Sequence, residues 1–333
     1  MPNSQIEIEA GEESVQTIRP PGTLQRFEGV AFAPTGNVIA VATSDTNTVF
    51  LYRQDASGRF EEMPFSSLEG KRAKLNYPHD VCFARYGNSE VLAVAQRGGA
   101  IAIYEKPVSC DAFQPDPAFE IYGPRTKLDY SDGVAFVPPD NNYLAACNLT
   151  LGTISFYRLL ASAPIRFEVE PVFELRHKSL CNPDGLAFSH CGRWLAVANH
   201  GNHSVSIFSR TNGMWGDDKT KYGPRPITII KDPALRHPHS LAFTPEGNHL
   251  VVTNAGANYF SLYSPKRFFL RTQWTQSPVI QKTFGPENIF REVHARNKME
   301  GGPKGVAVHK NSLAMCSPEH GLKIYTFREQ NFG

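Results

Sequence analysis

The chain lacks the features that mark membrane and secreted proteins. It contains no run of about 18 apolar residues, the length that a membrane-spanning helix needs. The N-terminal residues, MPNSQIEIEAGEES, are polar and acidic and lack the apolar core of a signal peptide. These absences lead us to expect a cytoplasmic protein with no membrane partner.

A large excess of charge of one sign is also absent. Lys and Arg total 34 against 32 Asp and Glu, which gives a formal net charge of +2. This balance predicts no broad electrostatic attraction to nucleic acid. Local basic clusters at residues 71–74 and 291–298 fall in expected loops, and we interpret them as solvated.

Paired cysteines and common catalytic motifs are missing as well. None of the six cysteines forms a CxxC pair. Three of them lie at small-residue positions of expected strands, so we expect buried, reduced thiols. No G-x-S-x-G, H-E-x-x-H, P-loop or dinucleotide-binding fingerprint occurs. The chain is therefore not expected to use covalent catalysis or an organic cofactor.

Short apolar runs separated by turns, in contrast, are abundant and repeat. Residues 182–208, NPDGLAFSHCGRWLAVANHGNHSVSIF, contain three runs rich in β-branched and aromatic residues, a pattern typical of an antiparallel meander. The unit occurs six times, with first runs that begin at Val30, Val81, Val134, Leu186, Leu241 and Val306. The middle residue of each first run is Ala or Cys, which suits strands crowded around an axis.

The repeating unit predicts an all-β protein, a six-bladed β-propeller of four-stranded antiparallel blades. Fourth strands are expected at residues 172–175, 227–230 and 279–283. The sixth unit has only three strands, and we expect residues 14–18 to add its outer strand and close the ring. A pair of stacked β-sandwiches is the alternative that the length permits.

We expect one domain over residues 1–333. Its blades are expected near residues 27–77, 78–130, 131–182, 183–237, 238–302 and 303–333, with the N-terminal strand 14–18 completing the last. The connection 284–302 is longer than its equivalents. Residues 287–298 could form a short helix there that narrows the mouth of the channel.

A charged residue or a histidine stands two positions before each first run. These six ring residues are Glu28, His79, Asp132, Asp184, His239 and Lys304. In a propeller they face the mouth of the central channel, where carboxylates and imidazoles can bind a divalent metal or act on a small polar substrate. A structural role is the alternative, because Asp before Gly is a common turn residue.

The loops between second and third strands are rich in Asn and His. Asn199, His200 and Asn254 in these loops, together with Lys304, are candidates for binding a small polar ligand. The alternative is that these residues form Asx turns.

The repeat P-D/H-G/S-L/V-A-F, followed by an L-A-V-A strand, resembles a superfamily of six-bladed β-propellers over residues 27–327. Its members include NHL-repeat, gluconolactonase/senescence-marker and lactonase-like proteins. The gluconolactonase branch binds a divalent cation through a Glu, an Asn and an Asp. Glu28 resembles the first of these, while Asp184 and His239 stand in place of the second and third. Seven-bladed lactonases share a P-H motif like that at His79.

The resemblance implies a small-molecule-binding propeller with a polar mouth and leaves enzymatic activity open. In one interpretation, Glu28, Asp184 and His239 hold one divalent ion (Ca, Mg, Mn or Zn) that assists lactone or ester hydrolysis, and His79 or Asp132 moves the proton. In the other, a non-catalytic propeller binds a protein partner or senses a ligand at the mouth. Neither the substrate nor the oligomeric state follows from these residues.

Overall fold

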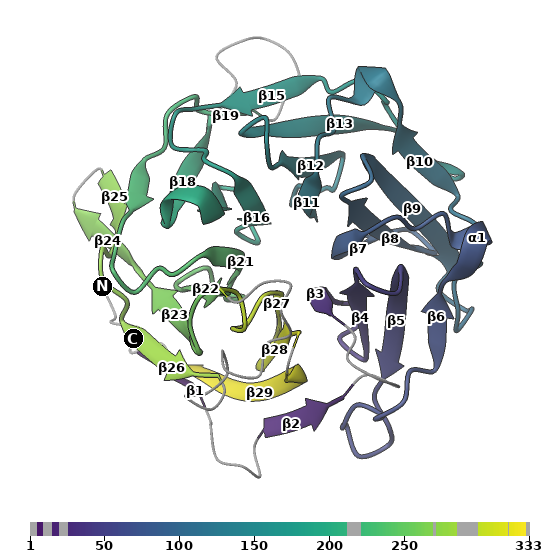
Figure 1. Ribbon diagram of the computed structural model, residues 1–333, viewed down its shortest axis with the longest axis horizontal. Helices are drawn as coiled ribbons and strands as arrows, with labels where there is room; N and C mark the ends of the chain where they lie inside the picture. The colour runs from purple at the N-terminus through teal and green to yellow at the C-terminus, as the bar shows by residue number, and fades with distance from the viewer. Residues whose placement is uncertain are drawn as a thin grey trace.

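Six antiparallel sheets surround a central channel in the computed structural model (Figure 1). The structure describes residues 5–8, 15–19, 26–211, 221–268, 271–284, 299–318 and 320–330. Over these residues the sheets follow one another around the ring in chain order, and each has four or five strands. The predicted six-bladed β-propeller is therefore confirmed.

The innermost strand of each blade lines the channel. These strands are β3 (Phe27–Phe32), β7 (Pro78–Tyr86), β11 (Ser131–Phe136), β16 (Pro183–Phe188), β21 (Pro238–Phe243) and β27 (Val306–His309). Each contacts the innermost strand of the next blade, and β27 contacts β3, so the contacts close a ring. The Ala or Cys in the middle of each strand keeps bulky side chains out of the channel that these six strands surround.

The second and third strands carry most of the apolar core. The second strands are β4 (Val38–Thr43), β8 (Ser89–Gln96), β12 (Tyr143–Asn148), β17 (Trp194–Asn199), β22 (Leu250–Asn254) and β28 (Ser312–Ser317). The third strands are β5 (Thr48–Arg53), β9 (Ala100–Pro107), β13 (Thr153–Ser162), β18 (Ser204–Thr211), β23 (Tyr259–Tyr263) and β29 (Gly321–Gln330). Six apolar clusters form, each between two neighbouring blades, so every blade buries both faces against its neighbours.

The outer strands have three or four residues each. They are β6 (Ser66–Leu68), β10 (Phe119–Tyr122), β15 (Phe173–Arg176), β20 (Thr228–Ile230), β26 (Ile280–Thr283) and β2 (Val15–Ile18). Three of them lie within one residue of the predicted fourth strands. Further short strands are β14 (Ile165–Phe167), β19 (Lys221–Tyr222), β24 (Pro265–Phe268) and β25 (Arg271–Trp274).

Helices are few and short in the described part of the chain. They are α1 (Gly70–Ala73) and the 3-10 turns η1 (Pro124–Thr126) and η2 (His200–Asn202). None of these is long or apolar enough to cross a bilayer. The helix predicted over 287–298 lies outside the described residues.

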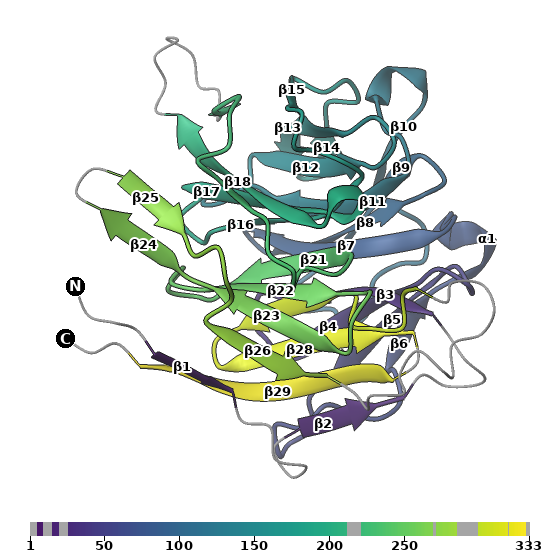
Figure 2. The same cartoon turned by 60° about the vertical axis from the view of Figure 1, so that its left-hand side comes forward.

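The sixth blade is completed from the other end of the chain. β2 pairs antiparallel with β29, so that Ile18 lies opposite Leu322 and Val15 opposite Tyr325 (Figure 2). β1 (Gln5–Ile8) pairs with the far end of the same strand. Ile18 is fully buried in the cluster between the sixth and first blades. The predicted closure by the N-terminal strand is confirmed, and it protects the edge of β29.

We expect Ile18→Ala to lower the free energy of unfolding by about 2–5 kcal/mol, because it leaves a cavity in a closed apolar cluster. The measurement is denaturant unfolding followed by tryptophan fluorescence. Thr17→Ala is the matched control at an exposed position of the same strand, and it should change stability by less than about 0.5 kcal/mol. Equal effects of the two substitutions would contradict this account of ring closure.

Candidate functional site

A β-bulge in five innermost strands directs the ring residues toward the channel. In β16, Pro183 pairs with Asn199 but Leu186 pairs with Val197, so the strand contains one extra residue around Asp184. The same one-residue shift occurs in β3, β7, β11 and β21. Bulges bend a strand and re-aim its side chains. The ring residues therefore leave the blade faces and converge on the axis.

Glycine follows the ring residue in four blades and lets neighbouring strands approach closely. A Cβ atom on Gly185 would lie 2.5 Å from the His239 carbonyl oxygen, and one on Gly133 would lie 2.4 Å from that of Asp184. Both distances are shorter than a van der Waals contact. The neighbouring atoms belong to the backbone and cannot move aside as a flexible side chain could. In the other two blades, Asp80 and Ser240 take this position.

All six ring residues are buried, with exposed fractions between 0% and 3%. Five of them (Glu28, His79, Asp132, Asp184 and His239) line one small cavity, together with Asp80, Gly185 and Ser240. The space open to the centre of a water molecule is about 10 Å³, enough for about one water or one ion. The ring predicted from sequence is therefore brought together.

Three cations balance part of the acidic charge. Lys304 Nζ lies 2.8 Å from Glu28 Oε2 and 3.0 Å from Glu300 Oε2. Arg26 forms an ion pair with the other oxygen of Glu28. The guanidinium of Arg97 donates to both oxygens of Asp132, at 2.7 and 2.8 Å.

Sequence reasoning missed Arg26 and Glu300. Both are charged residues in connections that lead into an innermost strand, and Glu300 falls in the long connection predicted to cover the mouth. Their positions in connections that lead to the mouth were the sequence signal that could have identified them.

The two ring histidines carry nitrogen atoms with no hydrogen-bond partner. His79 Nδ1 lies 3.0 Å from the Asp132 carbonyl oxygen, which places the proton on Nδ1. His79 Nε2 and His239 Nε2 have no hydrogen-bond partner, and each lies 3.6 Å from Glu28 Oε2. The rings stack with centroids 5.0 Å apart. Burial lowers the pKa of both imidazoles, so both are neutral at pH 7 and present free lone pairs.

The pKa values of the buried acids are shifted in different directions. Burial alone would raise the pKa of Glu28, but Lys304, His79 and Arg26 outweigh it and lower that pKa to about 2. Burial, assisted by the nearby Asp132, raises the pKa of Asp184 well above its usual range. Burial also raises the pKa of Asp80 to about 7. Glu28 is thus ionised at neutral pH, whereas burial favours the protonated form of Asp184.

His200 connects the buried cluster with the outer opening of the channel. Its side chain is 20% exposed, and its Nε2 lies 3.2 Å from Glu300 Oε1. Its Nδ1 has no hydrogen-bond partner and lies 3.5 Å from Asp184 Oδ2. Contact with His200 and attraction to Lys304 overcome the effect of burial and lower the pKa of Glu300. Glu300 can therefore orient the imidazole as an ionised acceptor.

The structure does not bring Asn199 or Asn254 into this cluster. Both are fully buried. The Asn199 amide accepts from the backbone of Cys181 and donates to two serines, at 3.0 and 3.2 Å. The Asn254 amide accepts from the Arg236 backbone and donates to Ser261. Both side chains thus tie the incoming loop to the second strand.

Two sets of side chains have the spacing of metal ligands. Glu28, His79 and His239 form one set and His79, Asp132 and Asp184 the other, with ligand atoms within 4.8 Å of one another in each. Ligand atoms about 2.0–2.2 Å from a tetrahedral Zn²⁺ ion are about 3.3–3.6 Å apart. The two 3.6 Å separations in the first set fit this geometry. The second set fits less well, because Arg97 already occupies both oxygens of Asp132.

The comparison with known families finds a partial match. The sequence profile of a family described as "Lactonase, 7-bladed beta-propeller" matches residues 176–287, about a third of the chain, which covers most of blades four and five. The present chain has six blades in its described part. No curated protein matches the chain in sequence.

Solved structures share the fold at low sequence identity. The β-propeller domain of Myceliophteria thermophila Cps50 (Swd1) has a TM-score of 0.57 and 12% identity over 94% of this chain and 86% of that one. A putative 6-phosphogluconolactonase from Bacteroides uniformis has a TM-score of 0.55 and 15% identity over 86% and 77% of the two chains. A functionally unknown protein from Desulfotomaculum acetoxidans has a TM-score of 0.55 and 13% identity over 90% and 85%. These likenesses show the β-propeller fold and nothing beyond it.

We expect Gly185→Ala to lower the free energy of unfolding by at least about 1–3 kcal/mol, because its Cβ would collide with backbone of the next blade. Gly223→Ala is the control, since the nearest atom there would be 3.6 Å away. Denaturant unfolding of both variants checks the claim. If Gly185→Ala left the free energy of unfolding unchanged, the innermost strands would have to lie farther apart at this point than the structure shows.

Proposed function

We propose that the protein binds one divalent metal ion at the mouth of its channel and uses it to hydrolyse a small lactone or ester. The observation that carries this proposal is the pair of buried imidazole nitrogens, His79 Nε2 and His239 Nε2, which lack a partner and lie equally far from Glu28 Oε2. Burying a polar nitrogen without a partner is unfavourable. A bound cation would satisfy both nitrogens at once.

The charge balance of the cluster also supports a cation. The described residues bring together five carboxyl groups and three cationic side chains, Arg26, Arg97 and Lys304. With neutral histidines, full ionisation of the acids leaves two negative charges in excess. A divalent ion would neutralise that excess, and so would protons on Asp184 and Asp80. Lys304 lies beside Glu28, and its positive charge repels a second cation at that position. A bound metal ion must therefore take over part of the neutralisation of Glu28 that Lys304 provides.

Two of the three metal ligands predicted from the sequence remain in this proposal. Glu28 and His239 remain, while His79 joins them in place of Asp184. Asp184 lies 3.6 Å from His239 Nε2 and 3.5 Å from His200 Nδ1. A proton on this acid can pass to His200, since His239 Nε2 would hold the metal ion.

The bound metal would polarise the substrate carbonyl and lower the pKa of a water molecule. The chain's own groups would then manage binding and proton transfer. The 10 Å³ cavity is too small for a lactone, so the substrate must sit above it, where Arg97 and His200 are partly exposed. His200, oriented by Glu300, is placed to accept a proton from water and return it to the leaving oxygen. We assign this role to His200 and not to His79 or Asp132, which are tied by hydrogen bonds.

A non-catalytic propeller is the second candidate. It is favoured by the network in which Lys304, Arg26 and Arg97 pair with Glu28, Glu300 and Asp132. Such a network could hold the six blades together and serve a ligand-sensing or protein-binding mouth. In that case the central cavity would contain water, and the cluster would do no chemistry.

We expect the full chain, stripped with chelator, to bind one divalent ion per molecule when Zn²⁺, Mn²⁺ or Ca²⁺ is titrated calorimetrically. His79→Ala and His239→Ala should each weaken binding by more than about 10- to 100-fold, the range caused by loss of an outer-shell group. The control is His190→Ala, an exposed histidine away from the mouth cluster. Failure of all three metals to bind, or binding unchanged in both histidine variants, would exclude the metal site.

We expect the metal-loaded protein to hydrolyse a lactone in a panel containing δ-gluconolactone and dihydrocoumarin. His200→Gln should lower kcat/KM by about 10²- to 10⁴-fold, the usual contribution of a general base, and should leave metal affinity unchanged. The assay is proton release at constant pH. Metal binding without hydrolysis of any substrate would favour the non-catalytic candidate. Full activity of His200→Gln would remove this residue from the mechanism.

A further inference from the structure

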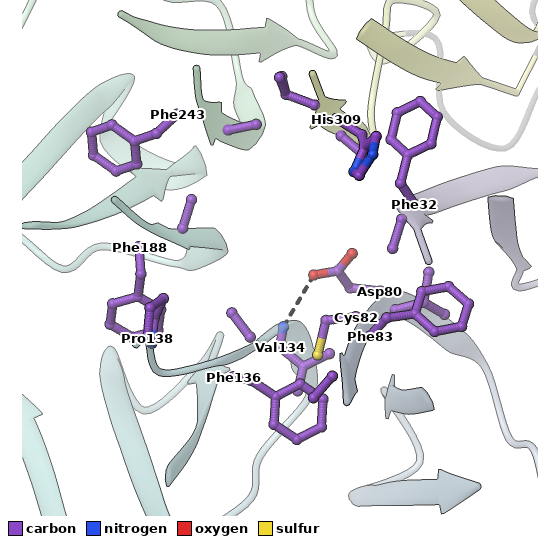
Figure 3. A pocket seen from close by; sticks show the side chains of 18 of the residues that line it. Phe32, Asp80, Cys82, Phe83, Val134, Phe136, Pro138, Phe188, Phe243 and His309 are labelled. Atoms are coloured by element: carbon purple, nitrogen blue, oxygen red, sulfur yellow. Dashed lines mark hydrogen bonds between the residues drawn. The ribbon is translucent and has the colours of Figure 1, made fainter. Parts of the chain in front are cut away.

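A second, larger cavity lies at the opposite end of the channel. Its volume is about 600 Å³, within the range of pockets that hold small organic molecules. It is lined by the innermost strands of all six blades, beyond the ring residues (Figure 3). We call it the lower chamber. Nothing in the proposed hydrolysis uses it.

The wall of the lower chamber repeats from blade to blade and is apolar in its middle layer, whereas Arg85, Asn141, His190 and His309 add polar groups to the lining. The middle residues of the innermost strands form the wall: Ala31, Cys82, Ala135, Ala187, Ala242 and Ala307. Aromatic side chains follow one position later and border the chamber, with rings that point away from its middle in Figure 3: Phe32, Phe83, Phe136, Phe188 and Phe243. Small groups on the wall leave the space open, and the phenylalanine side chains add apolar surface at its border.

Asp80 is the one acidic side chain among the described residues that line the chamber. The Asp80 carboxyl group projects toward the middle of the chamber and accepts a hydrogen bond from the Val134 backbone at 3.0 Å (Figure 3). Asp80 and Ser240 line both the lower chamber and the small cavity above it. They therefore form the polar floor between the two.

Asp80 differs from the other acids of the channel in its lack of a cation. Glu28, Asp132 and Glu300 each pair with Lys or Arg, and Asp184 faces two imidazoles. Among the described residues, no Lys, Arg or His nitrogen lies within 4.0 Å of the Asp80 carboxyl group. A carboxylate in an apolar cavity is stable only when it is paired or hydrogen-bonded. Two backbone N–H groups, those of Val134 and Val81, donate to this carboxyl group, and part of its accepting capacity stays unused.

We propose that the lower chamber binds a small apolar amine, with the ammonium group on Asp80 and the apolar body against the alanine wall and the phenylalanine side chains that border it. The amine supplies the missing cation, and an N⁺–H···O⁻ hydrogen bond is about twice as strong as a neutral one. Burial of the apolar body against these side chains is also favourable. A ligand bearing a carboxylate is disfavoured, because its charge would meet that of Asp80.

The test compares two probes that differ only in the polar head. Tryptamine carries an ammonium group, whereas tryptophol, indole-3-ethanol, carries a neutral hydroxyl in its place. Binding to the full-length protein is measured by ligand-observed NMR and calorimetry at pH 7.5. Tryptamine should bind at least about 10-fold more tightly than tryptophol, because hydrogen bonds to charged groups are stronger. Asp80→Asn should remove this difference while leaving tryptophol binding unchanged.

Two further variants locate the binding site. Ala187→Phe fills the chamber from its wall and should abolish binding of both probes, with folding checked by thermal unfolding. Asp140→Asn removes an exposed acid next to chamber-lining residues and should leave both affinities unchanged. The proposal is overturned if neither probe binds, if both bind equally, or if Asp80→Asn retains the preference for tryptamine. The measurements use protein stripped with chelator, so that a cation at the mouth does not contribute to the result.

Discussion

The close approach of six innermost strands to one axis is the constraint on which the structure depends. It requires glycine after most ring residues, as at Gly133 and Gly185, where a Cβ atom would collide with the backbone of the next blade. Because the strands are so close, side chains turned inward by the bulges meet in a space that holds one ion or one water. Burial of charge at the mouth therefore follows directly from backbone packing.

Burial and charge together determine what the mouth can do. Desolvation keeps His79 and His239 neutral, while Lys304 and Arg26 keep Glu28 ionised. Neutral imidazole and ionised carboxylate are the forms that bind metal. Lys304 has the opposite effect, because it supplies a positive charge where a metal would place one. The balance between these two cations decides whether the mouth is a metal site or a structural lock.

Much of the fold could be predicted from the sequence because the repeat is regular. Position relative to the Val-Ala-Phe runs was enough to identify all six ring residues, and an unused apolar segment was enough to predict ring closure. The contribution of Glu300 could not be predicted, because its place depends on a long connection outside the repeat. The buried amides of Asn199 and Asn254 were also beyond prediction. A polar loop residue can face a ligand or its own backbone, and only hydrogen-bond geometry distinguishes the two.

The central claim is that Glu28, His79 and His239 together hold a cation. The most direct measurement is X-ray diffraction from crystals soaked in Mn²⁺, recorded at a wavelength where manganese scatters anomalously. The account predicts an anomalous peak between the two Nε2 atoms and the Glu28 carboxylate, with Lys304 displaced or turned toward Glu300. A saturating soak with no anomalous peak there, and with Lys304 still bonded to Glu28, would contradict it.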